Sequence, residues 1–127
     1  MSINEPGKIY ERPWGTYQTL HINNQCQVKL LTVNPGGRLS LQKHFKRAEH
    51  WVIVQGEPTV TINDNRKNYQ VNQSVFIPVE AVHRIENLTT EICQLVEVQV
   101  GNYLGEDDIE RLEDIYGRME ENSSETL

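Results

Sequence analysis

Four residues of types that commonly bind metal ions are spaced along two segments of the chain. Gln42 and His44 are two residues apart, so on a β-strand their side chains leave the same face and can close on one ion. Glu49 follows at a spacing that returns it from the next strand, and His83 comes soon after the apolar stretch 74–77 and a proline turn. A mixed set of nitrogen and oxygen ligands suits manganese, iron, cobalt, nickel or zinc, and leaves positions open for water or substrate. The spacing therefore predicts a divalent metal site held by Gln42, His44, Glu49 and His83.

These ligands need short strands to carry them, and the surrounding sequence divides into short alternating segments separated by turn residues. The predicted strands are 25–33, 39–44, 50–55, 59–62, 74–77, 83–86 and 92–100. Seven or eight strands of this length favour an all-β jelly-roll barrel, which is just wide enough to hold one ligand. We expect a single domain over residues 1–127, with a barrel core at about 17–100, because the length leaves no room for a second core.

The segment after the last predicted strand has the period of a helix. The apolar residues that would share one helical face are Ile109, Leu112, Ile115, Tyr116 and Met119. The acidic residues 106–108 stand where the amino end of a helix favours negative charge. The pattern therefore predicts a short C-terminal helix at about 107–119, lying across the barrel.

Charge and cysteine content limit the classes of function. The net charge of −6 argues against a nucleic-acid partner, which would need a basic surface. The apolar stretches are too short to span a bilayer, so we expect no membrane partner. Cys26 and Cys93 lie far apart, form no Cys-x-x-Cys pair, and follow no apolar leader. These features favour free thiols in a reducing cytoplasm over a secreted disulfide scaffold.

The two ligand segments resemble the paired signature of the cupin superfamily. The first pattern, Gly-x5-His-x-His-x4-Glu-x6-Gly, fits residues 36–56 with Gln42 in the place of the first histidine. The second pattern, Gly-x5-Pro-x-Gly-x2-His-x3-Asn, is matched at Pro78, His83 and Asn87. Asn72 and Glu80 stand where this second pattern has glycines. The resemblance implies the cupin form of the jelly roll, a double-stranded β-helix.

Further stretches are similar to the isomerase domain of type II phosphomannose isomerases over residues 12–118. The stretches that carry this resemblance are 12–15, 39–44, 47–51, 97–99 and 103–109. In that family the domain usually follows a guanylyltransferase domain, and it commonly carries further histidines where this chain has Phe45 and Lys46. The resemblance implies interconversion of mannose 6-phosphate and fructose 6-phosphate, with one divalent metal bound by the residues matching the four ligands above. Such a metal can stabilise the negative charge of an enediolate.

A general base for this reaction must reach a carbon-bound proton and titrate near neutral pH. Glu97 and Gln99 share a strand face with Leu95, so we expect both to take part in catalysis if that face lines the barrel. The alternative is that Glu97 is a carboxylate that faces solvent. His50 directly follows Glu49, so strand alternation directs it away from the metal.

The phosphate of the substrate requires cations, and arginine offers a two-pronged donor set for phosphate oxygens. The candidate substrate-binding residues in or beside the motifs are Arg12, Lys43, Lys46, Arg47 and Arg84. Arg12 and Arg47 are expected in loops near the barrel mouth, whereas Arg84 directly follows His83 and is expected on the opposite face. Each of these could instead be an ordinary solvated charge, and we expect one or two to contact the substrate.

Two alternatives to a mannose-6-phosphate isomerase remain open. One is another sugar-phosphate isomerase or epimerase with the same proton-transfer groups, and the other is a noncatalytic cupin that binds a sugar or a metal. In every catalytic case the expected partner is a small-molecule sugar phosphate. Val52 and Val54 give one strand an apolar face that predicts a homodimer.

Overall fold

The computed structural model describes residues 3–117 and is built from β-strands, with no helix in this range. The strands are β1 (Ile9–Arg12), β2 (Gly15–Ile22), β3 (Cys26–Val33), β4 (Leu41–Lys43), β5 (Arg47–Gln55), β6 (Thr59–Ile62), β7 (Asn65–Asn68), β8 (Ser74–Ile77), β9 (His83–Glu86), β10 (Cys93–Gly101) and β11 (Glu110–Glu113). The prediction of an all-β fold is confirmed.

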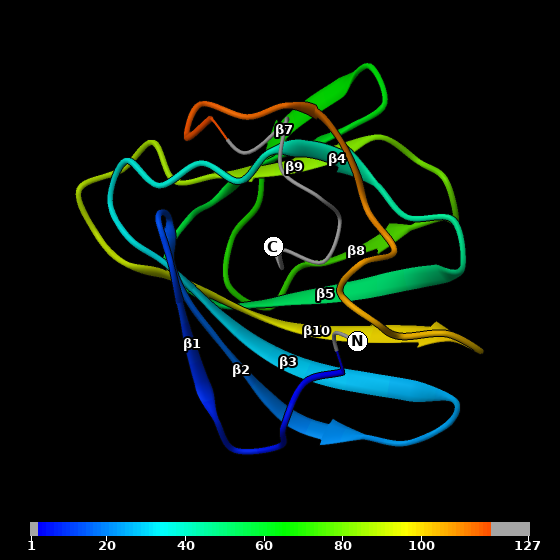
Figure 1. Ribbon diagram of the computed structural model, residues 1–127. Helices are drawn as coiled ribbons and strands as arrows, with labels where there is room; N and C mark the ends of the chain where they lie inside the picture. The colour runs from blue at the N-terminus through cyan, green and yellow to red at the C-terminus, as the bar shows by residue number, and fades with distance from the viewer. Residues whose placement is uncertain (1–2, 118–127) are drawn as a thin grey trace.

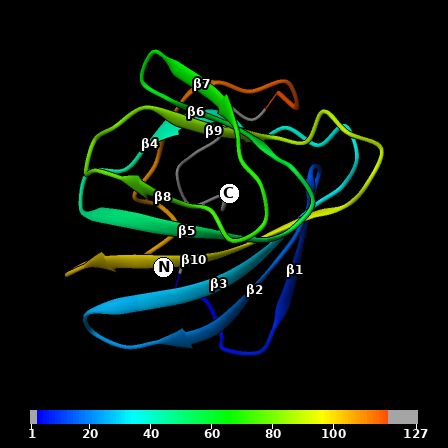
Figure 2. The same ribbon diagram turned by 180° about the vertical axis from the view of Figure 1, so that it is seen from behind.

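Two antiparallel sheets face each other and enclose the interior of the barrel (Figures 1 and 2). The larger sheet has the strand order β1-β2-β3-β10-β5-β8, and the smaller has the order β11-β4-β9-β6-β7. Strands far apart in the chain are therefore neighbours, such as β10 with both β3 and β5. This jelly-roll arrangement brings the two ligand segments of the sequence together, because β4 carries the first and pairs with β9, which carries the second.

All seven predicted strands are present, and there are four further strands, of which β7 lies within the expected core of 17–100 while β1, β2 and β11 extend the sheets to Ile9 and Glu113. Strands β1 and β2 form a hairpin that adds an edge to the larger sheet. Strand β7 is exposed along its whole length and consists of polar residues, so it lacks the alternation by which a half-buried strand is recognised.

The predicted helix at about 107–119 is wrong over the described residues. Strand β11 occupies this segment and pairs with β4, satisfying the backbone edge of the smaller sheet. The apolar positions do not form a buried face, because Leu112 and Ile115 are 40% and 52% exposed. The acidic residues expected at a helix start do not begin a helix. Glu106 and Asp108 are both buried. Met119 lies outside the described residues.

Inward-facing residues of the larger sheet form rows across the strands, and these rows change character along the barrel. One row is apolar and consists of Leu31, Leu95 and Ile53. The next row consists of Lys29, Glu97 and Trp51, and the one after it of Gln27, Gln99 and Glu49. All nine side chains are buried. The barrel therefore has an apolar end, which holds the hydrophobic core, and a polar end.

Three positions where the cupin pattern has glycine lie in turns with a left-handed backbone. Gly56 has a φ of 80°, and a Cβ there would lie 2.7 Å from the Ile92 carbonyl oxygen, so only glycine fits. Asn72 and Glu80, which replace pattern glycines, adopt φ values of 77° and 67°. The chain thus keeps the left-handed turns of the pattern without the glycines that favour them, and the Glu80 amide donates to the His44 carbonyl at 2.8 Å.

Candidate metal centre and polar cavity

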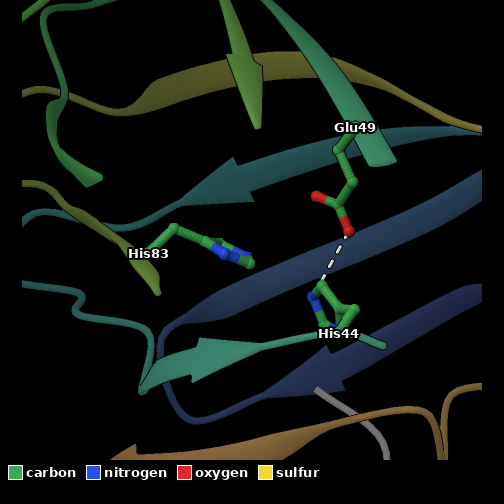
Figure 3. A group of neighbouring side chains, drawn as sticks. All are labelled: His44, Glu49 and His83. Atoms are coloured by element: carbon green, nitrogen blue, oxygen red, sulfur yellow. Dashed lines mark ion pairs between the residues drawn. The ribbon is translucent and has the colours of Figure 1, made fainter. Parts of the chain in front are cut away.

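Three predicted ligands converge at the polar end of the barrel. His44 follows β4, Glu49 is the third residue of β5, and His83 begins β9. Their side chains point toward one another from these three elements (Figure 3). One ligand atom from each lies within 4.8 Å of the others, and all three residues are buried. This spacing allows one ion to contact all three side chains.

Hydrogen bonds fix which nitrogen of each imidazole faces the centre. His44 Nδ1 lies 2.7 Å from the Asp108 carbonyl oxygen, and His83 Nδ1 lies 2.9 Å from the Ala81 carbonyl oxygen. A carbonyl can only accept, so each Nδ1 carries the proton and each Nε2 keeps its lone pair. Burial lowers the pKa of both histidines, His44 well below its usual value, with the Arg47 charge acting in the same direction. Both rings are therefore neutral at neutral pH, which is the form that binds metal.

Glu49 is held in its charged form. Burial alone would raise its pKa, but the Arg47 guanidinium holds the pKa of this carboxyl well below its usual range. Trp51 Nε1 also donates to Glu49 Oε1 at 2.8 Å. Glu49 Oε2 approaches His44 Nε2 at 3.3 Å, as the dashed line in Figure 3 marks. Two acceptor atoms face each other there, and such a pair requires a cation between or beside them.

Arg47 supplies a cation beside this pair. It is 2% exposed, and its Nε donates to Glu49 Oε2 at 2.8 Å. Its Nη2 lies 3.2 Å from His44 Nε2. The donor set of two neutral imidazoles and one carboxylate fits a divalent ion of the borderline class. Because His44 Nε2 has one lone pair, an ion bound there would displace this Arg47 contact.

Gln42, the fourth predicted ligand, reaches the same cavity. It pairs with His83 across β4 and β9, so both side chains leave the same face of the smaller sheet. Gln42 Nε2 donates to Ser40 Oγ at 2.9 Å, which leaves its Oε1 available as a ligand.

Glu97 lines the cavity beside the cluster. The cavity walls include Gln42, His44, Glu49, Trp51, His83 and Glu97, and the space between them has room for about one water molecule or ion, 10 Å³. Glu97 is 2% exposed, so it faces the barrel interior rather than solvent. Burial, reinforced by the nearby Glu49 charge, raises the pKa of Glu97 to about 7. A carboxyl with this pKa exchanges a proton readily near neutral pH.

Gln99 orients Glu97. Its Nε2 donates to Glu97 Oε1 at 2.8 Å, and its own Oε1 accepts from Gln27 Nε2 at 3.0 Å. Thr19 and Asn4 both donate to Gln27 Oε1, at 2.8 and 2.9 Å. The carboxyl is therefore held by a chain of buried amides whose orientation is fixed at each step.

The cations predicted to bind phosphate lie in different parts of the structure. Arg47 lies against the metal ligands, as described above. Arg12 stacks over the Tyr17 ring at 5.3 Å and donates to the Glu11 carbonyl, outside the cavity. Lys43 lies 3.9 Å from Glu110 on the edge of the smaller sheet.

Arg84 Nε donates to the Leu39 carbonyl oxygen at 2.9 Å, and its Nη1 pairs with Glu113, so its guanidinium is already engaged. His50 is exposed and packs on Phe76 at 4.8 Å between ring centroids, on the outer face expected for it.

Residues that the sequence did not single out complete the site. Asp108 binds the His44 ring through its carbonyl oxygen, and its carboxylate accepts from the amides of Phe45 and Lys46 at 2.9 and 3.0 Å. Lys29 lies in the polar end of the barrel, 2.8 Å from Glu106. Its signal in the sequence was a lysine alternating inward between Gln27 and Leu31, which is an unusual position for a charge.

Comparison with known proteins gives one consistent family. A family model described as "Mannose-6-phosphate isomerase C-terminal" matches residues 3–114. The alginate biosynthesis protein AlgA of Pseudomonas aeruginosa is 52% identical over 110 residues, which are 87% of this chain and 23% of that protein. The mannose-1-phosphate guanylyltransferase ManC of Salmonella typhimurium is 48% identical over 108 residues, 85% of this chain and 22% of that protein. The chain thus spans about a quarter of the length of these relatives.

Solved structures support the fold. An oxalate decarboxylase of Lactobacillus farciminis aligns with a TM-score of 0.72 at 23% identity, over 83% of this chain and 33% of that one. An RmlC-like cupin of Shewanella frigidimarina aligns with a TM-score of 0.68 at 19% identity, over 79% of this chain and 88% of that one. At these identities the likeness concerns architecture, and it confirms the predicted cupin barrel. Within residues 3–117, no helix is long and apolar enough to cross a membrane.

Proposed function

Because the chain belongs to the mannose-6-phosphate isomerase C-terminal family, we propose that it interconverts mannose 6-phosphate and fructose 6-phosphate with one bound divalent metal. The observation that carries the proposal is the position of Glu97. This carboxyl, with a pKa of about 7, lines the same cavity as the His44, Glu49 and His83 cluster. A proton-transfer group beside a cation site is the arrangement that aldose–ketose isomerisation requires.

His44, Glu49 and His83 would hold the metal, with Gln42 as a fourth ligand. When bound, the metal would stabilise the negative charge that develops on the sugar oxygens as the proton leaves carbon. One carboxylate among the ligands leaves a divalent ion with a net positive charge. The ligand set suits manganese, iron, cobalt, nickel or zinc.

Glu97 would transfer the proton between carbons 1 and 2 of the sugar. Its carboxylate form takes the proton from carbon 2 of the aldose, the hydroxyl proton of oxygen 2 passes to oxygen 1, and the resulting acid returns the carbon-bound proton to carbon 1 to give the ketose. Gln99 holds one carboxyl oxygen by its 2.8 Å hydrogen bond and leaves the other free for this exchange.

Isotope exchange tests this proposal directly. Metal-loaded protein is incubated with mannose 6-phosphate in deuterium oxide, fructose 6-phosphate is measured by a coupled assay, and deuterium at carbon 2 of the recovered aldose is measured by NMR. We expect net ketose and deuterium at carbon 2. Exchange without fructose 6-phosphate would instead assign the same machinery to another sugar phosphate.

A noncatalytic metal-binding cupin is the second candidate, and the small size of the cavity favours it. Room for about one water or ion accommodates a metal but no hexose phosphate in this conformation. Under this alternative the protein would retain metal and show no exchange with any hexose or pentose phosphate.

We also propose that two copies pair through the outer face of β5 and β8. A second proposal is that the protein works in a reducing compartment. Val52, Val54 and Phe76 are 40%, 43% and 52% exposed on this face, which supports the pairing. Cys26 and Cys93 are both free thiols, which supports the compartment. Sedimentation of the purified protein, compared with Val54→Glu, tests the dimer: the variant should sediment as a monomer.

A further inference from the structure

Lys29 is a buried cation without a role in the mechanism above. Its side chain is fully buried, and its Nζ lies 2.8 Å from Glu106 Oε2 and 4.1 Å from the centre of the Tyr17 ring. Apart from these two contacts, the ammonium forms no well-directed hydrogen bond. Burying a charge is costly, and an ammonium has three protons to donate, so Lys29 has binding capacity that the protein leaves unused.

Two further polar atoms in the same end of the barrel are also without partners. Arg47 Nη1 and Glu106 Oε1 are buried and form no hydrogen bond. Arg47 interacts electrostatically with both Glu106 and Glu97. Lys29 interacts with Glu97 in the same way. Two cations with unused donors therefore lie at this end of the barrel, and an added anion could accept hydrogen bonds from both.

The order of groups across the sheet matches the order of groups in a hexose phosphate. Lys29 on β3 is the direct neighbour of Glu97 on β10, and Glu49 lies on β5 at the other side of β10. With strands about 4.8 Å apart, the backbones of β3 and β5 lie about 10 Å apart, and Glu97 lies on the strand between them. In an extended hexose 6-phosphate, the reacting carbons are at one end and the phosphate is at the other. A sugar whose carbon 2 lies at Glu97 would direct its phosphate toward β3.

The segment that carries Glu106 also borders the metal centre. We call residues 102–108 the strap. Through Glu106 it binds Lys29 and Asn4, and through Asp108 it binds the His44 ring and the amides of Phe45 and Lys46. The cavity beside the metal centre has room for about one water or ion and is lined by other segments, so the strap joins Lys29 to the His44 ring without itself forming the cavity wall.

We propose that Lys29 and Arg47 form the phosphate subsite of this protein, and that Glu106 occupies it until the substrate phosphate replaces the carboxylate. The inference deepens the proposed function and rests on it for the identity of the sugar. The Glu106 carboxylate and a phosphate monoester offer similar oxygens to the same donors, so one can exchange for the other. The strap then moves away from Lys29 as the phosphate arrives, which couples entry of the substrate to release of Glu106.

Charge-neutralising variants distinguish an exchangeable carboxylate from a purely structural ion pair. Glu106→Gln keeps the shape and removes the competing charge. Lys29→Met removes the cation, and Lys29→Met combined with Glu106→Gln leaves no unpaired charge if the single lysine variant fails to fold. Lys67→Met is the matched control, because Lys67 also stacks on a tyrosine ring, at 5.2 Å, but on the exposed strand β7.

Binding of mannose 6-phosphate, mannose and inorganic phosphate to the metal-loaded proteins is measured by calorimetry, and turnover is measured separately. We expect Glu106→Gln to bind mannose 6-phosphate and inorganic phosphate about three- to tenfold more tightly, with mannose unaffected. The double variant should bind mannose 6-phosphate about 10- to 100-fold more weakly and raise KM far more than it changes kcat. Lys67→Met should behave like the parent.

Weaker phosphate binding by Glu106→Gln, or parental affinity in the double variant, would overturn the subsite, because a structural pair predicts those results. Failure of the subsite and failure of the function give different results. If the protein is an active isomerase and substitution of Lys29 leaves KM unchanged, only the subsite is refuted. An inactive protein whose phosphate affinity depends on Lys29 refutes only the isomerase.

Discussion

The two ends of the barrel interior are built from the same strands but bury different kinds of side chain. On β10, Cys93 and Leu95 face the apolar end, whereas Glu97 and Gln99 face the polar end four residues later. Strand β3 makes the same change between Leu31 and Lys29. The change occurs at one row across neighbouring strands, so it is a property of the barrel rather than of one strand.

The difference shows where stability and chemistry come from. The apolar end buries large side chains that need no partners, and each contributes free energy of folding through the hydrophobic effect. The polar end buries charges whose desolvation costs about as much as their pairing returns. A protein keeps such an end when the groups are needed for binding or catalysis. Mutations at the two ends should therefore affect different measurements.

The largest effect is expected when a metal ligand is removed from the polar end. His44→Ala deletes one of three convergent donors, so metal content should fall close to zero and turnover by at least about 10³-fold. Elemental analysis and the coupled assay check the two results. His50→Ala is the matched control, because this histidine packs on Phe76 outside the barrel and should change neither. Full turnover by a metal-free His44→Ala protein would remove the metal from the mechanism.

Loss of the proton-transfer group should have the next largest effect. Glu97→Gln keeps the hydrogen bond from Gln99, because the new amide oxygen can still accept it. We expect kcat to fall by about 10²- to 10⁴-fold and deuterium exchange at carbon 2 to stop, while metal content stays at the parental level. Glu91→Gln, at an exposed position, serves as the control. Exchange that continues in Glu97→Gln would assign the base to another residue.

Much of the metal centre could be predicted from the sequence because its information is local. Strand alternation places Gln42 on the same face as His44, and it places Glu97 on the same face as Leu95. The hydrophobic period that identifies strands also identifies which side chains face inward. For these residues the sequence predicts which side chains share a strand face, and the structure gives the distances between them.

The rest of the site depends on contacts between distant segments. Glu106 looked like the start of a helix, but it is buried against Lys29, a residue 77 positions earlier on β3. Residues 110–113 form strand β11 instead of the expected helix, because they pair with β4. No local sequence pattern reveals this pairing between distant segments. Arg47 was expected at the mouth, and only the fold shows that it bridges His44 and Glu49.

Truncation of a core residue tests the apolar end. Leu95→Ala removes a fully buried side chain and should lower the free energy of unfolding by about 2–5 kcal/mol, as measured by urea denaturation. KM and metal content should stay near the parental values, because Leu95 lies one row away from Glu97. Val96→Ala, on the outer face of the same strand, should cost clearly less. A raised KM in Leu95→Ala would show that the two ends are not independent.

The smallest effect is a pH dependence of stability that isolates the charge of Glu97. Because burial raises its pKa from 4.5 to about 7, the folded protein binds a proton at pH values where the unfolded chain has released it. The contribution of Glu97 to stability is therefore present below pH 4.5 and lost as the pH rises through 7. Each pKa unit corresponds to about 1.4 kcal/mol, so the loss approaches about 3 kcal/mol.

The two histidines act in the opposite direction, because their lowered pKa values destabilise the fold as the pH falls below about 6.5. A comparison of metal-free parent with metal-free Glu97→Gln removes most of their contribution, since both proteins keep both rings. The variant should gain stability relative to the parent between pH 4.5 and 7 and then remain at a constant difference, as measured by urea denaturation at several pH values. A difference that does not change with pH would mean that Glu97 is charged in the fold at pH 5 and is not the group that exchanges protons near neutral pH.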